Sequence, residues 1–253
     1  MTTQQDCARS MKPLFPFTYA KLKAQYREAL NQEYAVIRCC DYVNLKRNGL
    51  PPKTLVNRVD IDFSVKKAGQ LGQLFNDLGI KATFFVRLHA PEYNPFSFEN
   101  YRIIKALIQS GHEIGYHSEI LDQAAIWAED AAACLQRDID VINKMFGIRI
   151  RGVASHRGMT GLNNLDFWKD KTPADFDLLY EGYDKQPAFN LFQEAFYVSD
   201  SEWTQWKCYN KGTLVAGNTQ SLGDHVKDGH ALLYLLIHPD TYFERHFYED
   251  EGG

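Results

Sequence analysis

The feature that most restricts the fold is an alternation of short apolar runs with amphipathic helical patterns, which begins at residue 55. The β-rich runs occupy residues 55–63, 80–86, 111–119, 148–154 and 232–237. Between the first four, apolar residues recur every three or four positions, which is the spacing of one helix face. Such repeats predict parallel strands joined by right-handed helical crossovers. We therefore expect an α/β fold with a parallel sheet, either open or closed into a barrel.

The chain before this alternation is predicted to be an accessory segment. Residues 1–54 are expected to form an N-terminal extension packed on a main domain of residues 55–253. The extension shows one helical stripe between residues 19 and 30 and a mixed segment at 34–43 that we interpret as a short strand. It is too short to hold much core of its own.

Composition excludes several functional classes. The formal net charge is −4 over 253 residues, without a basic run, so we expect neither nucleic acid nor a membrane surface as partner. The five cysteines are odd in number and match neither a disulfide framework nor a C-x-x-C metal site. We find no signal peptide and no apolar run of about 18–20 residues that would form a transmembrane segment. The protein is expected to be cytoplasmic.

Polar side chains that bind metals or transfer protons stand at the ends of the predicted strands. They are Asp60, Asp62, His117, Glu119, His156, Arg157 and His238. In a parallel sheet these strand ends share one rim, where α/β folds build their sites. Each residue alone has a plainer interpretation, such as a helix cap for an aspartate or a hydrogen-bonded core position for a histidine. Their joint occurrence favours a site, and carboxylate with imidazole suits zinc or another divalent first-row metal.

The ordered series RVDID, KATFFV, GHEIGYH, SHRG and LLIHP resembles the polysaccharide deacetylase family, carbohydrate esterase family four, in its branch with an R-x-D-x-D start. The resemblance covers residues 55–238 and keeps the family's order and spacing. It implies a distorted (β/α) barrel of the polysaccharide-deacetylase type. It also implies metal-dependent hydrolysis of an acetyl group on a sugar.

The resemblance also assigns roles to residues. By this likeness Asp60 is the catalytic base, Asp62 is the metal-binding carboxylate and His117 is the first ligand histidine. His238 resembles the general acid near the leaving group, and Arg157 the arginine that orients the base. The implied cofactor is a divalent metal, with Zn²⁺ as our expectation.

One position departs from the family's pattern. The family has a second ligand histidine four residues after the first, and this chain has Leu121 there, which cannot bind a metal. We expect His156 to supply the third ligand, because adjacent strands lie ~4.8 Å apart and an imidazole can span that distance. Glu119 as the ligand, or loss of the metal, are the alternatives.

The expected substrate is an N-acetylated sugar, either free or linked to a nucleotide or lipid, such as a precursor of a surface polysaccharide. Glu119, Tyr93 and Asp200 are predicted to contact it. Aromatic residues in polar loops, including Trp203 and Trp206, offer faces on which a sugar can stack, although ordinary loop packing also explains them. Two other functions stay open: another C–N hydrolase, such as a deformylase or cyclic amidase, and a catalytically silent sugar-binding protein.

Overall fold

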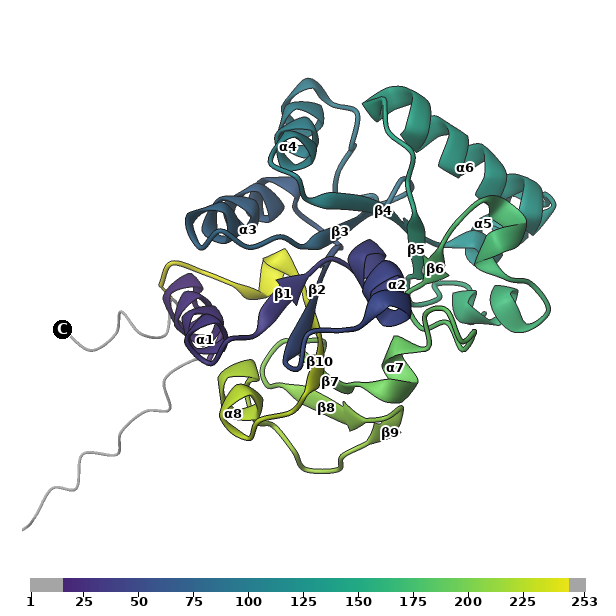
Figure 1. Ribbon diagram of the computed structural model, residues 1–253. Coiled ribbons are helices and arrows are strands. Elements are labelled where there is room, and N and C mark those ends of the chain that lie inside the picture. Colours follow the sequence, from purple (N-terminus) through teal and green to yellow (C-terminus); the bar gives the residue numbers. More distant parts are fainter. Residues whose placement is uncertain (1–15, 246–253) are drawn as a thin grey trace, which may run out of the picture.

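The computed structural model describes residues 16–245 and contains one ten-stranded sheet with helices around it (Figure 1). The strand order is β6-β5-β4-β3-β2-β10-β7-β8-β9, and β1 pairs with β2 as well. All neighbours are parallel except β7–β8 and β8–β9, which are antiparallel. The strands are β1 (Ala35–Ile37), β2 (Thr54–Ile61), β3 (Thr83–Val86), β4 (Glu113–Ser118), β5 (Gly152–Ser155), β6 (Tyr180–Glu181), β7 (Phe196–Ser199), β8 (Lys207–Asn210), β9 (Thr213–Leu214) and β10 (Leu232–Ile237).

From β2 to β5 the connections between parallel strands are helical, as the alternation predicted. The α-helices are α1 (Tyr19–Asn31), α2 (Cys39–Asn48), α3 (Val65–Asp77), α4 (Phe98–Gln109), α5 (Ile120–Trp127), α6 (Ala131–Phe146), α7 (Leu191–Glu194) and α8 (Leu222–Lys227). Three 3₁₀ helices span Asn164–Lys169, Pro173–Phe176 and Pro239–Thr241. Within the described part of the chain, no helix has both the length and the apolarity needed to cross a membrane.

The mixed segment at 34–43 was only partly predicted. The strand there is limited to Ala35–Ile37, and α2 begins at Cys39. The helix starts so early because the Asp41 carboxylate caps it, accepting hydrogen bonds from the backbone N–H of Arg38 at 3.2 Å and from the Arg38 guanidinium at 2.7 Å. The strand β8 was not predicted, because its sequence KCYN lacks an apolar run and it is held by antiparallel pairing to β7.

Alternate residues of β2 pack into two different hydrophobic cores. Leu55, Val59 and Ile61 belong to the first core, which also contains apolar residues of α1, α3, α4 and α6. Val56 belongs to the second core, which lies on the opposite face of the sheet and includes residues of α2 and α7. Because side chains alternate along a strand, Asp60 lies on the same face as Val56, the face of the second core. Asp62 is two residues further on, just beyond the end of β2.

The strand path ends at β6 and β9, and no pairing joins these two ends among residues 16–245. The structure therefore shows a mixed α/β fold with a central sheet, and closure into a barrel stays a prediction. Of the predicted extension, residues 1–15 lie outside the described residues, and β1 joins the same sheet as β2. The division after residue 54 also stays a prediction.

Candidate active site and metal centre

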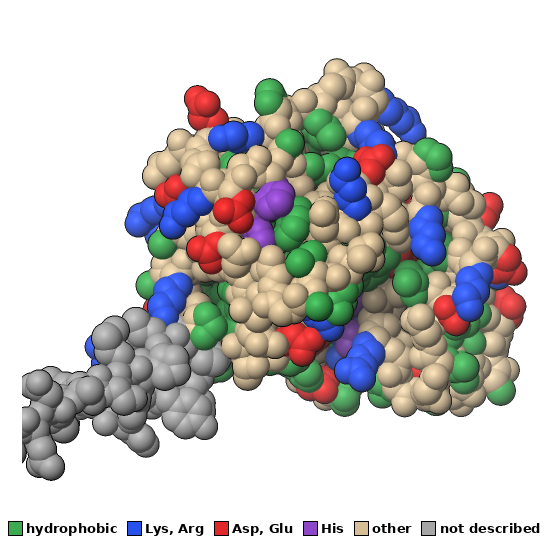
Figure 2. All heavy atoms as spheres, turned by 90° about the horizontal axis from the view of Figure 1, so that it is seen from below, with side chains coloured by type: hydrophobic (Ala, Val, Ile, Leu, Met, Phe, Trp, Pro, Cys, Tyr) green, Lys and Arg blue, Asp and Glu red, His purple; other side chains and the backbone are tan. Residues whose placement is uncertain are grey.

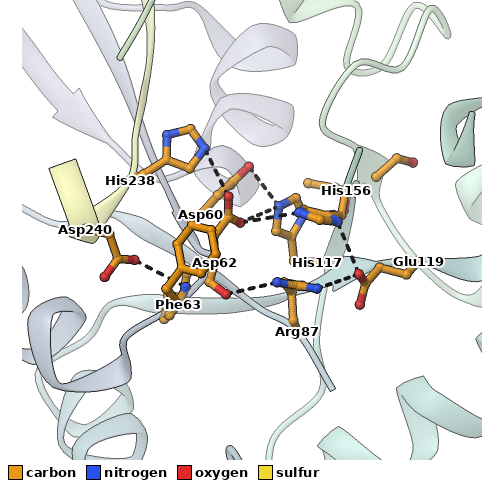
Figure 3. Close-up of polar contacts among 12 residues, drawn as sticks. Asp60, Asp62, Phe63, Arg87, His117, Glu119, His156, His238 and Asp240 are labelled. Atoms are coloured by element: carbon orange, nitrogen blue, oxygen red, sulfur yellow. Dashed lines mark hydrogen bonds and ion pairs between the residues drawn. The ribbon is translucent and has the colours of Figure 1, made fainter. Parts of the chain in front are cut away.

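Five of the predicted side chains converge at the carboxyl ends of β2, β4, β5 and β10 (Figure 3). Asp60 and Asp62 come from β2 and its end, His117 from β4, and His156 and His238 directly follow β5 and β10. All five border one cleft of about 520 Å³. Parallel pairing brings them together, because it puts these strand ends on one rim.

Three of these residues could hold a metal ion. Oδ1 of Asp62 lies 3.3 Å from Nε2 of His117 and 3.9 Å from Nε2 of His156. One ligand atom from each of the three residues lies within 4.8 Å of the other two. Oδ1 of Asp62 is buried and has no hydrogen-bond partner in the described part of the chain. A buried carboxylate oxygen that faces two imidazoles is a favourable position for a cation.

The second nitrogen of each histidine also faces a protein oxygen. Nδ1 of His117 lies 2.8 Å from the carbonyl oxygen of Ala154, which can only accept, so Nδ1 carries the proton and Nε2 presents its lone pair to Asp62. Nδ1 of His156 lies 3.1 Å from Oε1 of Glu119, within ion-pair distance but without the alignment of a hydrogen bond. Backing of a ligand histidine by a carbonyl or carboxylate is usual at zinc sites. The donor set therefore fits Zn²⁺.

Arg87 connects the two sides of this group and was not predicted. Its guanidinium donates to Oε1 of Glu119 at 2.7 Å and to the backbone carbonyl oxygen of Asp62 at 3.0 Å. Burial raises the pKa of Glu119, but the nearby His156 and Arg87 side chains outweigh it and hold that pKa below 4.5. Glu119, predicted to contact substrate, is thus placed behind His156 and is only 3% exposed.

Asp60 is held by the arginine two residues before it. Arg58 donates to Oδ1 of Asp60 from Nε at 2.8 Å and to Oδ2 from its terminal nitrogen at 2.7 Å. Burial raises the pKa of Asp60, but the charge of Arg58 outweighs it and keeps the pKa below 3.8. Arg157, predicted for this role, is exposed on the cleft and has no ion pair with Asp60 in the described chain. The i, i+2 spacing of Arg58 and Asp60 on one strand was the available signal.

His238 is paired with a buried carboxylate. Its Nδ1 lies 2.6 Å from Oδ1 of Asp200, and its backbone N–H donates to Oδ2 of the same carboxylate at 2.9 Å. Burial lowers the pKa of His238, but the Asp200 carboxylate outweighs it and raises the pKa to about 9. Asp200 is fully buried, so it positions His238 and does not take the predicted place on the substrate. Nε2 of His238 lies 3.8 Å from Asp62.

The predicted aromatic contacts separate into two groups. Trp203 lines the cleft beside His238, with 5.3 Å between the ring centroids, and packs on Phe63 at 5.7 Å. Trp206 is buried against Phe17, and Tyr93 uses its hydroxyl to hold the backbone, donating to the carbonyl oxygen of Ile61 at 2.9 Å. Neither of these two lines the cleft.

No family model and no curated protein matches this sequence. Solved structures that are similar to it include the two that follow. The Streptococcus pyogenes deacetylase PplD in complex with acetate is 17% identical with a TM-score of 0.43, and the match covers 54% of this chain and 61% of that one. A mutant of BA3943, described as a CE4 family pseudoenzyme with restored enzymatic activity, is 16% identical with a TM-score of 0.42 over 75% of this chain and 58% of that one. This chain thus spans about three fifths of each, and at these values the likeness itself assigns neither fold nor activity.

Proposed function

We propose that the protein is a metal-dependent hydrolase that removes the acetyl group from an N-acetylated sugar. One observation carries this proposal: the Asp62–His117–His156 group shares a cleft with a second carboxylate, Asp60, and with His238. His238 is in turn paired with the buried carboxylate of Asp200. Amide hydrolysis needs a polarised carbonyl, a base for the attacking water and an acid for the leaving nitrogen. A bound Zn²⁺ would supply the polarisation and lower the pKa of water.

In this proposal Asp60 is the general base. Its bidentate pair with Arg58 keeps the carboxylate ionised and fixes its orientation toward the cleft. The carboxylate takes a proton from the attacking water as the new C–O bond forms. Because Arg58 is itself buried and hydrogen-bonded to Tyr234, the base keeps this orientation without substrate.

His238 is the general acid. Its Nδ1 faces the Asp200 carboxylate, so Nε2 is the nitrogen that can give a proton to the cleft. The raised pKa keeps the ring protonated at neutral pH. As the C–N bond breaks, Nε2 donates its proton to the leaving nitrogen, which would otherwise depart as a strongly basic anion.

The cleft walls suit a sugar. Phe63 and Trp203 are 43% and 38% exposed and give one side an aromatic surface, on which a pyranose ring can stack. Arg157 is an exposed cation on the same cleft and could face a phosphate. We propose a nucleotide- or lipid-linked precursor of a surface polysaccharide as substrate, with the reaction in the cytoplasm and the fold a distorted (β/α) barrel.

The test combines metal analysis with an acetate-release assay. Zinc-loaded wild-type protein is incubated with free, nucleotide-linked and oligomeric N-acetylated sugars, beside Asp60→Asn and an exposed control, Asp170→Asn. We expect acetate from the wild type and the control, and none from Asp60→Asn at equal zinc content. Fully loaded wild type that releases no acetate overturns the proposal: release of formate or opening of a cyclic amide would identify the other hydrolases, and sugar binding without turnover the silent binder.

A further inference from the structure

A second group of metal-ligating side chains lies at the C-terminal end of α8, outside the catalytic cleft. His225 is in the last turn of α8, Asp228 caps that helix and His230 follows two residues later, before β10 begins. One ligand atom from each lies within 4.8 Å of the other two, and Nδ1 of His225 is 3.8 Å from Oδ2 of Asp228. Because His238 follows the other end of β10, this group lies at the opposite edge of the sheet.

The backbone explains why three residues so near in sequence converge. Gly229 has φ +77°, and its N–H donates to the carbonyl oxygen of Val226 at 3.1 Å. This left-handed residue ends the helix and turns the chain back, so that His230 faces the last turn. The spacing H-x-x-D-x-H is therefore a local signature of the cluster.

Both imidazole rings are held in place by packing. Phe196 contacts His225 and His230 with ring centroids 4.3 Å and 4.2 Å apart. The carbonyl oxygen of His230 accepts a hydrogen bond from the hydroxyl of Tyr34 at 2.6 Å. Rings fixed in this way lose little conformational freedom when they bind a ligand.

The other nitrogen of His225 is already engaged. Nε2 lies 3.3 Å from Sγ of Cys208, and the carbonyl oxygen of Gln220 lies 3.7 Å from the same sulfur. The thiol can therefore donate to Gln220 while its sulfur accepts the Nε2 proton of His225. That arrangement leaves a free lone pair on Nδ1, 3.8 Å from Oδ2 of Asp228, as in histidines that bind metals through Nδ1.

Nδ1 of His225 is buried and lacks a hydrogen-bond partner among residues 16–245, in a side chain that is 1% exposed. When the ring proton is on Nε2, both Nδ1 of His225 and the carboxylate oxygen of Asp228 are acceptors, and no donor lies between them. A cation resolves this arrangement, and one can enter from solvent because the side chain of Asp228 is 50% exposed. Figure 2 shows a face on which histidine side chains reach the surface beside acidic ones.

We propose that His225, Asp228 and His230 form a second binding site for a divalent transition metal, of which Zn²⁺ is the best match to two imidazoles and one carboxylate. The site is structural: it would join the last turn of α8 to the residues that lead into β10. It does not depend on the proposed catalysis.

The test is zinc titration by calorimetry in a background that lacks the first group, Asp62→Ala/His117→Ala. We expect one equivalent of zinc to bind this background and to raise its Tm. Asp228→Asn, at an exposed position, should weaken binding at least tenfold. His230→Phe keeps a ring against Phe196 but has no ligand nitrogen, and should do the same. The matched control is Asp170→Asn, another exposed aspartate, which should bind as the background does.

Three results decide the outcome. Binding that both variants weaken and the control does not supports the site. A background that binds no zinc overturns it, as does binding that neither variant changes. If His230→Phe does not fold, Asp228→Asn alone tests the site, because the side chain of Asp228 faces solvent and does not pack in the core.

Discussion

Arg58 and Asp60, two residues apart on one strand, form a bidentate ion pair in which neither side chain is more than 2% exposed. Removing one partner of a buried pair leaves an uncompensated charge. We expect Arg58→Met to lower the free energy of unfolding by about 3–5 kcal/mol, as measured by urea denaturation.

The matched control is the double variant Arg58→Met/Asp60→Asn, which buries no unpaired charge. It should regain much of the stability lost in Arg58→Met while remaining inactive. A double variant as unstable as the single one would show that packing of Arg58 against Phe85 and Tyr183, and not its charge, dominates.

The metal content of variants should distinguish the metal ligands from the residues that only orient those ligands. Asp62→Ala, His117→Ala and His156→Ala should each lose zinc at the first site, because each removes one of three donor atoms. Glu119→Gln should keep the metal with affinity lower by about 10–100-fold, the usual effect of losing a group that orients a ligand. Elemental analysis of protein dialysed against a series of buffered zinc concentrations measures both the loss of zinc and the lowered affinity. Full zinc occupancy in His156→Ala would exclude His156 as a ligand.

His238 and Asp200 should behave as one acid. His238→Gln should reduce kcat by about 10²–10⁴-fold, the range for loss of a general acid. Asp200→Asn removes the carboxylate that holds Nδ1, so it should also reduce kcat, with little further loss in the double variant. The readout is the steady-state rate of acetate release at saturating substrate. Loss of zinc from His238→Gln would instead identify His238 as a ligand.

Stability should decrease as the pH falls from neutral, and His112 gives one reason. The ring is 4% exposed, and Nδ1 accepts a hydrogen bond from the N–H of Ala82 at 3.2 Å. Burial, together with the charge of Lys81, lowers its pKa from 6.5 to about 4. Between these values the unfolded chain binds the extra proton, so the folded state loses stability as the pH falls, by about 3 kcal/mol from this group.

The control for that prediction is His112→Asn, which keeps an acceptor near the place of Nδ1 but does not titrate. Its free energy of unfolding, measured by urea denaturation from pH 7 to pH 4, should fall less steeply than that of the wild type. Parallel curves would show that His112 is not the group responsible.

The sequence predicted the elements whose pattern is strong, and local spacing predicted which side chains share a face. The alternation after residue 55 yielded the mixed α/β fold, and the D-x-D spacing predicted that Asp60 and Asp62 face one place, which is the cleft that both border. Short elements escaped prediction where capping or strand pairing, and not periodicity, decides the structure. Such determinants include the Asp41 carboxylate that caps α2 and the pairing of β8.

The partners within the site depend on tertiary neighbours that no local pattern shows. Asp200 reaches His238 because β7 lies next to β10, although 38 positions separate the two residues in the chain. Glu119 and Arg87 meet through the pairing of β3 with β4. Leu121 packs against the first core, and the third member of the group that could hold a metal is His156, from the end of the next strand.

The position of β10 has a consequence for how the chain folds. It is the last described strand, yet it lies in the middle of the sheet, paired on one side with β2 and on the other with β7. During synthesis β2 therefore keeps one edge unpaired until more than 170 further residues have been added, as counted from Ile61 to Ile237. Such long-range pairing is slow and leaves a strand edge open to wrong partners. Recovery of native protein should thus depend on chain concentration and on protection of that edge until Leu232–Ile237 arrives.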